Sequence, residues 1–287
     1  MPKYFISAGC SFSDTHSTEF NLYNDFVAEY LDAELINLGI GGTGNQFIAH
    51  TFMNNVKQKL DSGVPAENIF GIVQWSMIHR YAFVSGEEAL GHNPNAHILQ
   101  RLIYPRSFSN YESMPMDDCG WISIAPWMTN QDTATETPEL HHLSREYYIN
   151  LQNKHTDVLN TLTLYSLVKS FCEKYNIKVM FTWMDESNRE AVTHAQPEWM
   201  YNHLTDHVKG SIDLPGIRQA VIEYEKVTSD VWCENDYQGH PNELGHKMYF
   251  EEYISSKFPR LIFKVGPKIL FCSVHSSLTI TSVDIFL

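Results

Sequence analysis

The sequence lacks the cysteine pairs that hold small secreted domains and zinc-binding domains together. Its five cysteines are widely separated, and none forms a Cys-x-x-Cys pair: Cys10, Cys119, Cys172, Cys233 and Cys272. An odd and dispersed set of this kind indicates neither a disulfide framework nor a structural zinc site. We therefore expect a soluble protein of a reducing compartment that has no structural metal.

Long apolar runs and an excess of basic residues are also missing. No stretch of about 18 apolar residues occurs, and the first residues lead directly into a strand-like run, so we expect neither a membrane-spanning helix nor a secretory signal. The expected location is therefore the cytoplasm. The chain has 20 Lys and Arg residues against 34 Asp and Glu residues. Nucleic acids and anionic membranes select clustered basic residues, so we expect neither as a partner, and the oligomeric state stays open.

Strand-like and helix-like segments alternate along much of the chain. Strands are expected over 3–8, 34–38, 68–75 and 177–183, and helices over 21–31, 45–60, 140–175, 217–227 and 242–256. This alternation predicts a parallel sheet covered by helices on both faces. In such a sheet the ligand site lies beyond the carboxyl ends of the strands.

Three parts of the chain depart from this pattern. Between about 78 and 138, Gly, Pro, Asn and aromatic residues are mixed without a period, which predicts an irregular insertion that serves as a lid or binding wall. Residues 185–216 are also expected to be irregular. Residues 258–287 form an apolar tail with few charges, to which the sequence assigns no role. We therefore expect one domain over residues 1–257, followed by the tail.

Two short motifs carry candidate chemistry. Gly9-Cys-Ser-Phe-Ser-Asp14 follows the first expected strand, and its Ser11 is placed as a strand-end nucleophile would be. His240-Pro241, preceded by Asp236, stands near the other end of the chain. A histidine supplies the base that a neutral serine needs, and a nearby carboxylate can hold the ring in the productive tautomer.

These motifs resemble those of the SGNH (GDSL-type) serine hydrolases. The family's first block, Gly-Asp-Ser-x-Ser, matches residues 9–13 except that Cys10 replaces the aspartate. The second block matches Asn37-Leu-Gly-Ile-Gly-Gly42, and the last matches residues 236–241. The resemblance implies a flavodoxin-like three-layer α/β/α fold and ester hydrolysis through an acyl-enzyme without metal or organic cofactor.

The same resemblance suggests roles for individual residues. Ser11 corresponds to the nucleophile, His240 to the base and Asp236 to the acid, with acyl or acetyl esters, some of them carbohydrate-linked, as substrates. The backbone amides of Ser11 and Gly42 correspond to oxyanion-hole donors.

Two positions depart from the family pattern. The third block normally supplies an asparagine to the oxyanion hole, but here the strand end reads Val73-Gln-Trp-Ser-Met77, so that Ser76, Gln74 or Asn45 has to substitute. The acid normally precedes the histidine by three residues, and that position is Tyr237. Asp236 lies one residue earlier.

Two other interpretations remain. Gly39-x-Gly-x-x-Gly44 fits a dinucleotide-binding fingerprint, but Asp61, the acidic residue at the right distance, precedes the next strand instead of ending it. An SGNH-fold domain that binds glycans with little or no catalysis is the second alternative. The aromatic residues of the insertion, such as Trp121 and Trp127, suit sugar stacking. His246, inside the last expected helix, is interpreted as a packing or surface histidine.

Overall fold

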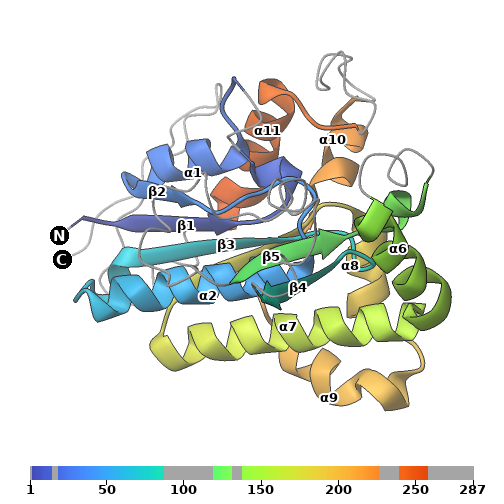
Figure 1. Ribbon diagram of the computed structural model, residues 1–287. Coiled ribbons are helices and arrows are strands. Elements are labelled where there is room, and N and C mark those ends of the chain that lie inside the picture. Colours follow the sequence, from blue (N-terminus) through green and yellow to red (C-terminus); the bar gives the residue numbers. More distant parts are fainter. Residues whose placement is uncertain (1, 15–18, 87–118, 131–137, 226–238, 258–287) are drawn as a thin grey trace, which may run out of the picture.

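The computed structural model describes residues 2–14, 19–86, 119–130, 138–225 and 239–257 (Figure 1). Asp236, Tyr237 and the apolar tail over 258–287 therefore lie outside the described residues.

A five-stranded, all-parallel sheet forms the centre of the structure (Figure 1). Its strands are β1 (Tyr4–Ala8), β2 (Glu34–Asn37), β3 (Ile69–Trp75), β6 (Lys178–Trp183) and β7 (Asp213–Gly216). They follow the order β2-β1-β3-β6-β7, which is the flavodoxin-like order of a doubly wound sheet. Every residue of β3 is buried, as expected for a central strand covered on both faces.

Helices cover both faces of this sheet, so the molecule has three layers (Figure 1). One layer contains α2 (Asn45–Asp61), α7 (Lys154–Tyr175) and α9 (Glu198–Val208). The other contains α1 (Tyr23–Leu31), α10 (Ile217–Glu225) and α11 (Glu243–Tyr249), which continues as a π-helical turn over Phe250–Ile254. Helix α8 (Glu186–Thr193) packs beside the edge strand β7, and α6 (Pro138–Glu146) precedes α7. The expected α/β/α fold class is confirmed.

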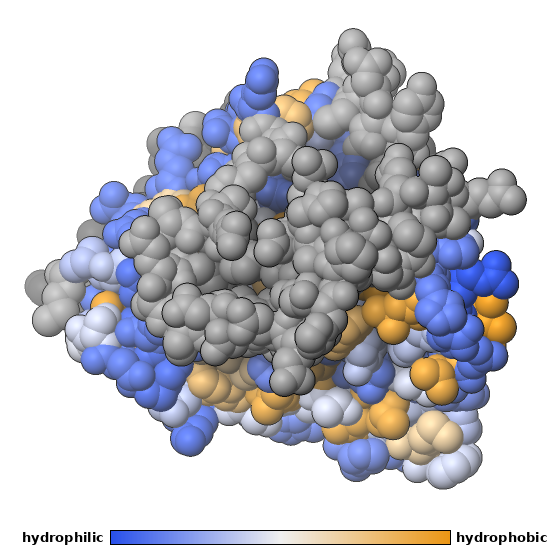
Figure 2. Space-filling model, in the orientation of Figure 1, coloured by the Kyte–Doolittle hydropathy of each residue, from blue (hydrophilic) through white to orange (hydrophobic). Residues whose placement is uncertain are grey.

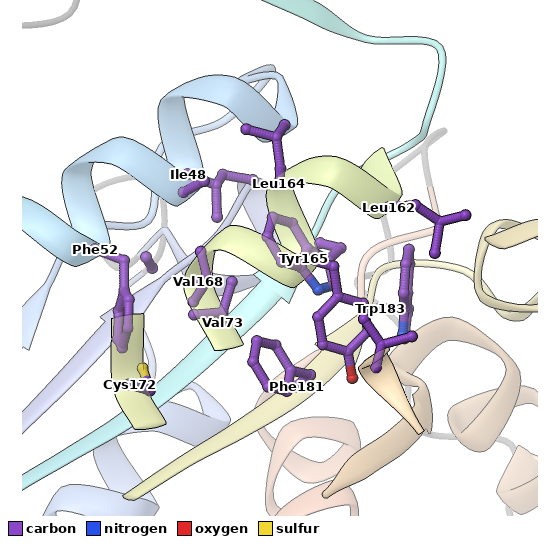
Figure 3. Close-up of a cluster of buried hydrophobic side chains, with 14 of the residues drawn as sticks. Ile48, Phe52, Val73, Leu162, Leu164, Tyr165, Val168, Cys172, Phe181 and Trp183 are labelled. Carbon is purple, nitrogen blue, oxygen red and sulfur yellow. The ribbon is translucent and has the colours of Figure 1, made fainter. Parts of the chain in front are cut away.

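The core on the α2–α7 side is rich in large aromatic rings (Figure 3). Tyr165 of α7 lies against Phe181 of β6, with ring centroids 4.2 Å apart, and Trp75 and Trp183 pack around the same pair. All four side chains are almost completely buried. Full burial of such side chains contributes roughly 1.5–3 kcal/mol each, so this cluster anchors the strands that carry the site at their ends.

Local capping explains where several helices begin and end. The Asn153 side chain accepts a hydrogen bond from the Thr156 amide at the start of α7, and Asp185 caps α8 through Ser187 in the same way. Asn176 ends α7 in the left-handed region, with φ of 55°. The Asn242 side chain accepts from the Gly245 amide and starts α11 directly after the His240 motif.

The expectation of irregular structure over 185–216 was wrong. This segment contains α8, α9 and β7. Helix α8 buries only Asn188 and Val192, so its sequence shows little apolar periodicity. Strand β7 has four residues and includes Pro215, which an edge strand tolerates because one side of its backbone has no partner strand.

A second sheet lies inside the segment that was expected to be an irregular insertion. Strands β4 (Tyr81–Gly86) and β5 (Cys119–Ile124) pair antiparallel, and a 3-10 turn over Pro126–Thr129 follows them. The Ala82 amide donates to the Gln46 side chain at 3.0 Å, and Phe47 packs against Trp121. The strand pair thus covers the amino-terminal end of α2.

The surface of the described residues mixes hydrophilic and hydrophobic side chains on the face shown in Figure 2. Apolar residues with substantial exposure occur on α6, α7 and the turn between them: Leu143, Ile149, Leu151 and Leu159. None of the helices in the described ranges combines the length and hydrophobicity that crossing a lipid bilayer requires.

Candidate active site

The structure brings Ser11 and His240 together although 229 positions separate them in the sequence. Ser11 begins a 3-10 turn over Ser11–Ser13 directly after β1, and His240 precedes the start of α11. The Ser11 Oγ and His240 Nε2 atoms are 2.7 Å apart, and both side chains are partly exposed. This is the distance at which an imidazole can take the proton of an attacking hydroxyl.

The imidazole ring of His240 packs against the ring of Phe12. The two ring centroids lie 4.8 Å apart at an interplanar angle of 68°, an edge-on contact, and Phe12 is fully buried. For Nε2 to accept the serine proton, Nδ1 has to carry the other ring proton. Asp236, the residue assigned to hold that proton, lies outside the described residues, so its role stays a prediction.

The glycine loop after β2 lies against the nucleophile turn. The Ile40 amide donates to the Gly9 carbonyl at 3.1 Å, and the Gly41 amide donates to the Asp14 Oδ2 atom at 2.9 Å. A Cβ atom added to Gly41 would stand 3.7 Å from the Ser11 Cβ atom. The Asp14 side chain therefore joins the two loops.

The two amides assigned to the oxyanion hole occupy suitable positions in their turns. The Ser11 amide is the first of its 3-10 turn, and such an amide has no partner within the turn. Residues 40–43 form a turn closed by the Thr43 amide, and Gly42 adopts φ of 82° at the position where a type II turn requires glycine. The amide of that position is not used by the turn. The oxyanion role of both amides stays a prediction.

Two of the three side chains considered for the oxyanion hole, Asn45 and Ser76, form hydrogen bonds with other residues. Asn45, the first residue of α2, accepts from the Ser76 amide through Oδ1 at 2.8 Å and donates from Nδ2 to Thr161 on α7 at 3.3 Å. The Ser76 hydroxyl accepts from the Arg80 guanidinium at 2.9 Å, and both Asn45 and Ser76 are buried. These contacts join α2, α7 and the end of β3.

Gln74, at the end of β3, holds the nucleophile turn from inside the molecule. Its Oε1 atom accepts from the Cys10 amide at 3.1 Å and from the Ser13 hydroxyl at 3.0 Å, while Nε2 lies 3.2 Å from the Cys10 sulfur. A Cβ atom added to Gly9 would lie 2.6 Å from Oε1, so only glycine fits there. Two of the three departures from the family pattern, Cys10 and the strand end with Gln74, thus contact each other.

Replacing Gln74 with alanine is expected to lower the free energy of unfolding by about 2–4 kcal/mol and to lower the catalytic rate. The change leaves the buried Cys10 amide without its acceptor, at a cost of about 1–3 kcal/mol. It also removes one of the two partners of the Ser13 hydroxyl, which keeps its contact with the Tyr23 hydroxyl, at a further cost of about 1 kcal/mol. Urea denaturation measures the first effect. Gln219→Ala, which removes a surface contact to Glu223 on α10, is the matched control. A Gln74→Ala protein as stable as this control would contradict the role of Gln74.

His246 lies inside α11 and is fully buried, in agreement with its interpretation as a packing residue. Its ring stacks on Tyr23 with centroids 6.0 Å apart, and its Nδ1 atom has no hydrogen-bond partner in the part of the chain that the structure describes. Burial, and secondarily the charge of His240, lowers the pKa of His246 to about 3. His246 therefore stays neutral throughout the range in which a catalytic histidine titrates.

The described residues offer no cluster of three or more His, Cys, Asp or Glu side chains that could hold a metal ion. The dinucleotide interpretation of the glycine loop is also disfavoured by the fold. A Cβ atom added to Gly44 would lie 2.8 Å from the Ala82 amide nitrogen, so β4 occupies the space that a pyrophosphate would need at the start of α2.

Comparison with known proteins gives similarity in structure but not in sequence. No family model matches the chain, and no curated protein matches it significantly. The structure is similar to that of a member of the lipolytic protein G-D-S-L family from Veillonella parvula DSM 2008, with 9% identity, a TM-score of 0.43, and coverage of 92% of this chain and 100% of the other. It is also similar to a structure described as a lipolytic protein of the G-D-S-L family from Desulfitobacterium hafniense DCB-2, with 10% identity, a TM-score of 0.39, and coverage of 91% and 99%.

Proposed function

We propose that the protein is a serine ester hydrolase of the SGNH (GDSL) type. The observation that carries this proposal is the 2.7 Å contact between the Ser11 hydroxyl and His240 Nε2 at the carboxyl edge of the parallel sheet. A serine and a histidine placed far apart in the sequence have no structural need to meet at a partly exposed sheet edge, whereas a nucleophile and its base do.

In the first half of the proposed reaction, Ser11 Oγ attacks the ester carbonyl while His240 Nε2 takes the serine proton. The carbonyl oxygen becomes an oxyanion, and the amides of Ser11 and Gly42 donate to it. His240 then delivers its proton to the leaving alcohol as the C–O bond of the ester breaks. The product of this half is an acyl group on Ser11 Oγ.

In the second half, water attacks the acyl-enzyme and His240 takes a proton from it. Collapse of the second tetrahedral intermediate breaks the bond to Ser11 Oγ, and His240 returns the proton to the serine. The carboxylic acid leaves. The edge-on contact with Phe12 supports this role of His240, because the same ring has to face Ser11 in both halves.

We propose acyl or acetyl esters as substrates, including those carried on carbohydrates. The resemblance of the motifs to the SGNH hydrolases supports this choice. The Trp127 side chain is 43% exposed next to the β4–β5 strand pair and could stack on a sugar ring.

A panel of p-nitrophenyl esters from acetate to butyrate tests the proposal with the wild-type protein. We expect release of p-nitrophenol at a rate well above spontaneous hydrolysis, fastest with a short acyl chain. Absence of turnover with every ester would contradict the proposal. Absence of turnover together with binding on a glycan array would favour the non-catalytic glycan-binding domain. The hydrogen bonds that Asn45 and Ser76 form with Thr161 and Arg80 support this alternative.

A further inference from the structure

Arg80, between β3 and β4, is a buried cation that has no carboxylate partner among the residues that the structure describes. The residue is only 5% exposed, and no Asp or Glu of the described ranges forms an ion pair with it. A buried charge normally requires an opposite charge and a full set of hydrogen bonds, since its desolvation costs several kcal/mol. The protein as a whole is acidic, so a buried arginine that no described carboxylate neutralises is unusual in it.

The contacts of the guanidinium group are all with neutral groups. Nη1 donates to the Ser76 hydroxyl at 2.9 Å, and the Trp127 ring lies over the group, with its centroid 4.7 Å from Cζ. The Nε atom is buried and has no hydrogen-bond partner within the described ranges. Nε and Nη2 form the edge of a guanidinium that binds a carboxylate or phosphate through two parallel hydrogen bonds. The edge that Ser76 does not use is therefore the one suited to an anion.

Neighbouring side chains do not supply the missing charge. The Tyr148 hydroxyl donates to the carbonyls of His79 and Ile124 at 2.7 and 3.0 Å, and burial raises its pKa, so it stays neutral. Burial, followed by the charge of Arg80, lowers the pKa of His79. The buried carboxylate of Asp157 accepts a hydrogen bond from the Gln152 side chain and forms no ion pair with Arg80 among the described residues.

Arg80 is also fixed next to the nucleophile strand. Ala8 of β1 pairs with Val73 of β3. Ser11 lies three residues after Ala8, and Ser76 lies three residues after Val73, so both serines lie at the same edge of the sheet. The Ser76 hydroxyl holds Arg80 there. The Trp127 ring, which lies over the guanidinium, is 43% exposed.

We propose that Arg80 and Trp127 form an anion subsite of the active site, and that the ester substrates carry an acidic group, a carboxylate, phosphate or sulfate. This inference rests on the proposed ester hydrolysis. Nε is buried in the present arrangement, so the groups that cover it have to move before the anion can form its two bonds with Nε and Nη2. The anion then supplies the counter-charge that Arg80 lacks.

Binding of anions, measured independently of catalysis, is the first test. Monomethyl succinate, added to the Ser11→Ala protein, should change tryptophan fluorescence and bind at least about 10-fold more tightly than neutral dimethyl succinate, as two charge-assisted hydrogen bonds allow. Adding Arg80→Gln should remove this preference, and Arg80→Lys should keep part of it. Arg145→Gln, a change at an exposed arginine of α6, should leave it intact.

Catalysis gives the second test and identifies which part of the substrate carries the acid. The ratio of kcat/KM for mono-p-nitrophenyl succinate to that for p-nitrophenyl butyrate tests an acidic acyl group. The ratio for acetylated glucuronic acid to acetylated glucose tests an acidic alcohol. We expect one ratio to exceed about 10 in the wild type and to fall towards 1 in Arg80→Gln.

The two proposals fail in different ways. Equal binding of the neutral and anionic succinate esters by the Ser11→Ala protein, or a preference that persists in a folded Arg80→Gln variant, would overturn the anion subsite while ester hydrolysis stands. Anion binding without turnover of any ester would overturn the hydrolase and leave the subsite in place.

Discussion

Replacing Ser11 with alanine is expected to lower ester hydrolysis by a factor of about 10³ or more, because no other group can accept the acyl chain. The fold should be unaffected, since the Ser11 side chain is partly exposed and its hydroxyl contacts the side chain of His240. The measurement is kcat/KM for the best p-nitrophenyl ester, together with the unfolding temperature of both proteins.

Ser62→Ala is the matched control for this change. Ser62 lies on the surface at the end of α2, and its hydroxyl donates to the Lys59 carbonyl. Its activity should equal that of the wild type. If Ser11→Ala retained more than a tenth of the wild-type activity, the acyl-enzyme mechanism would be wrong.

The second large effect is the dependence of catalysis on the protonation of His240. Nε2 has to be unprotonated to take the serine proton, so kcat/KM should be constant at alkaline pH and should fall about tenfold per pH unit once the ring becomes protonated. His246 does not contribute such a limb, because its pKa is lowered to about 3. A rate profile from pH 5 to 9 measures this.

Variants test whether His240 causes the fall of kcat/KM at acidic pH. His240→Gln should lose a factor of about 10³ or more in kcat/KM, as expected for removal of a general base from such a pair. His203→Gln, at an exposed position of α9, should keep both the rate and the profile. A flat wild-type profile down to pH 5, or a His240→Gln variant with an unchanged rate, would rule out His240 as the base.

Those parts of the fold that carry strong apolar patterns could be predicted from the sequence. The strands of the sheet centre are buried on both faces, so their residues form apolar runs that stand out from the helices between them. Helix α8 and strand β7 could not be predicted, because α8 buries two side chains and β7 has four residues with a proline. Their structure depends on packing against the sheet edge, which a local pattern does not contain.

The sequence predicted those residues of the site that belong to recognisable motifs. Ser11 and His240 could be named from their motifs, and the structure brings them into contact. Asn45 and Ser76 were assigned to the oxyanion hole by sequence position, but their partners, Thr161 and Arg80, come from other elements. Only the register of β1 on β3 places the Gln74 side chain against the nucleophile turn, and no sequence motif reports that register.

Labelling with a fluorophosphonate tests the central claim most directly, because the reagent forms a covalent bond only with an activated serine. The account predicts one modified peptide, with the phosphonate on Ser11, and no label in the His240→Gln protein. Labelling of a different serine, or no labelling of the folded wild-type protein, would contradict it.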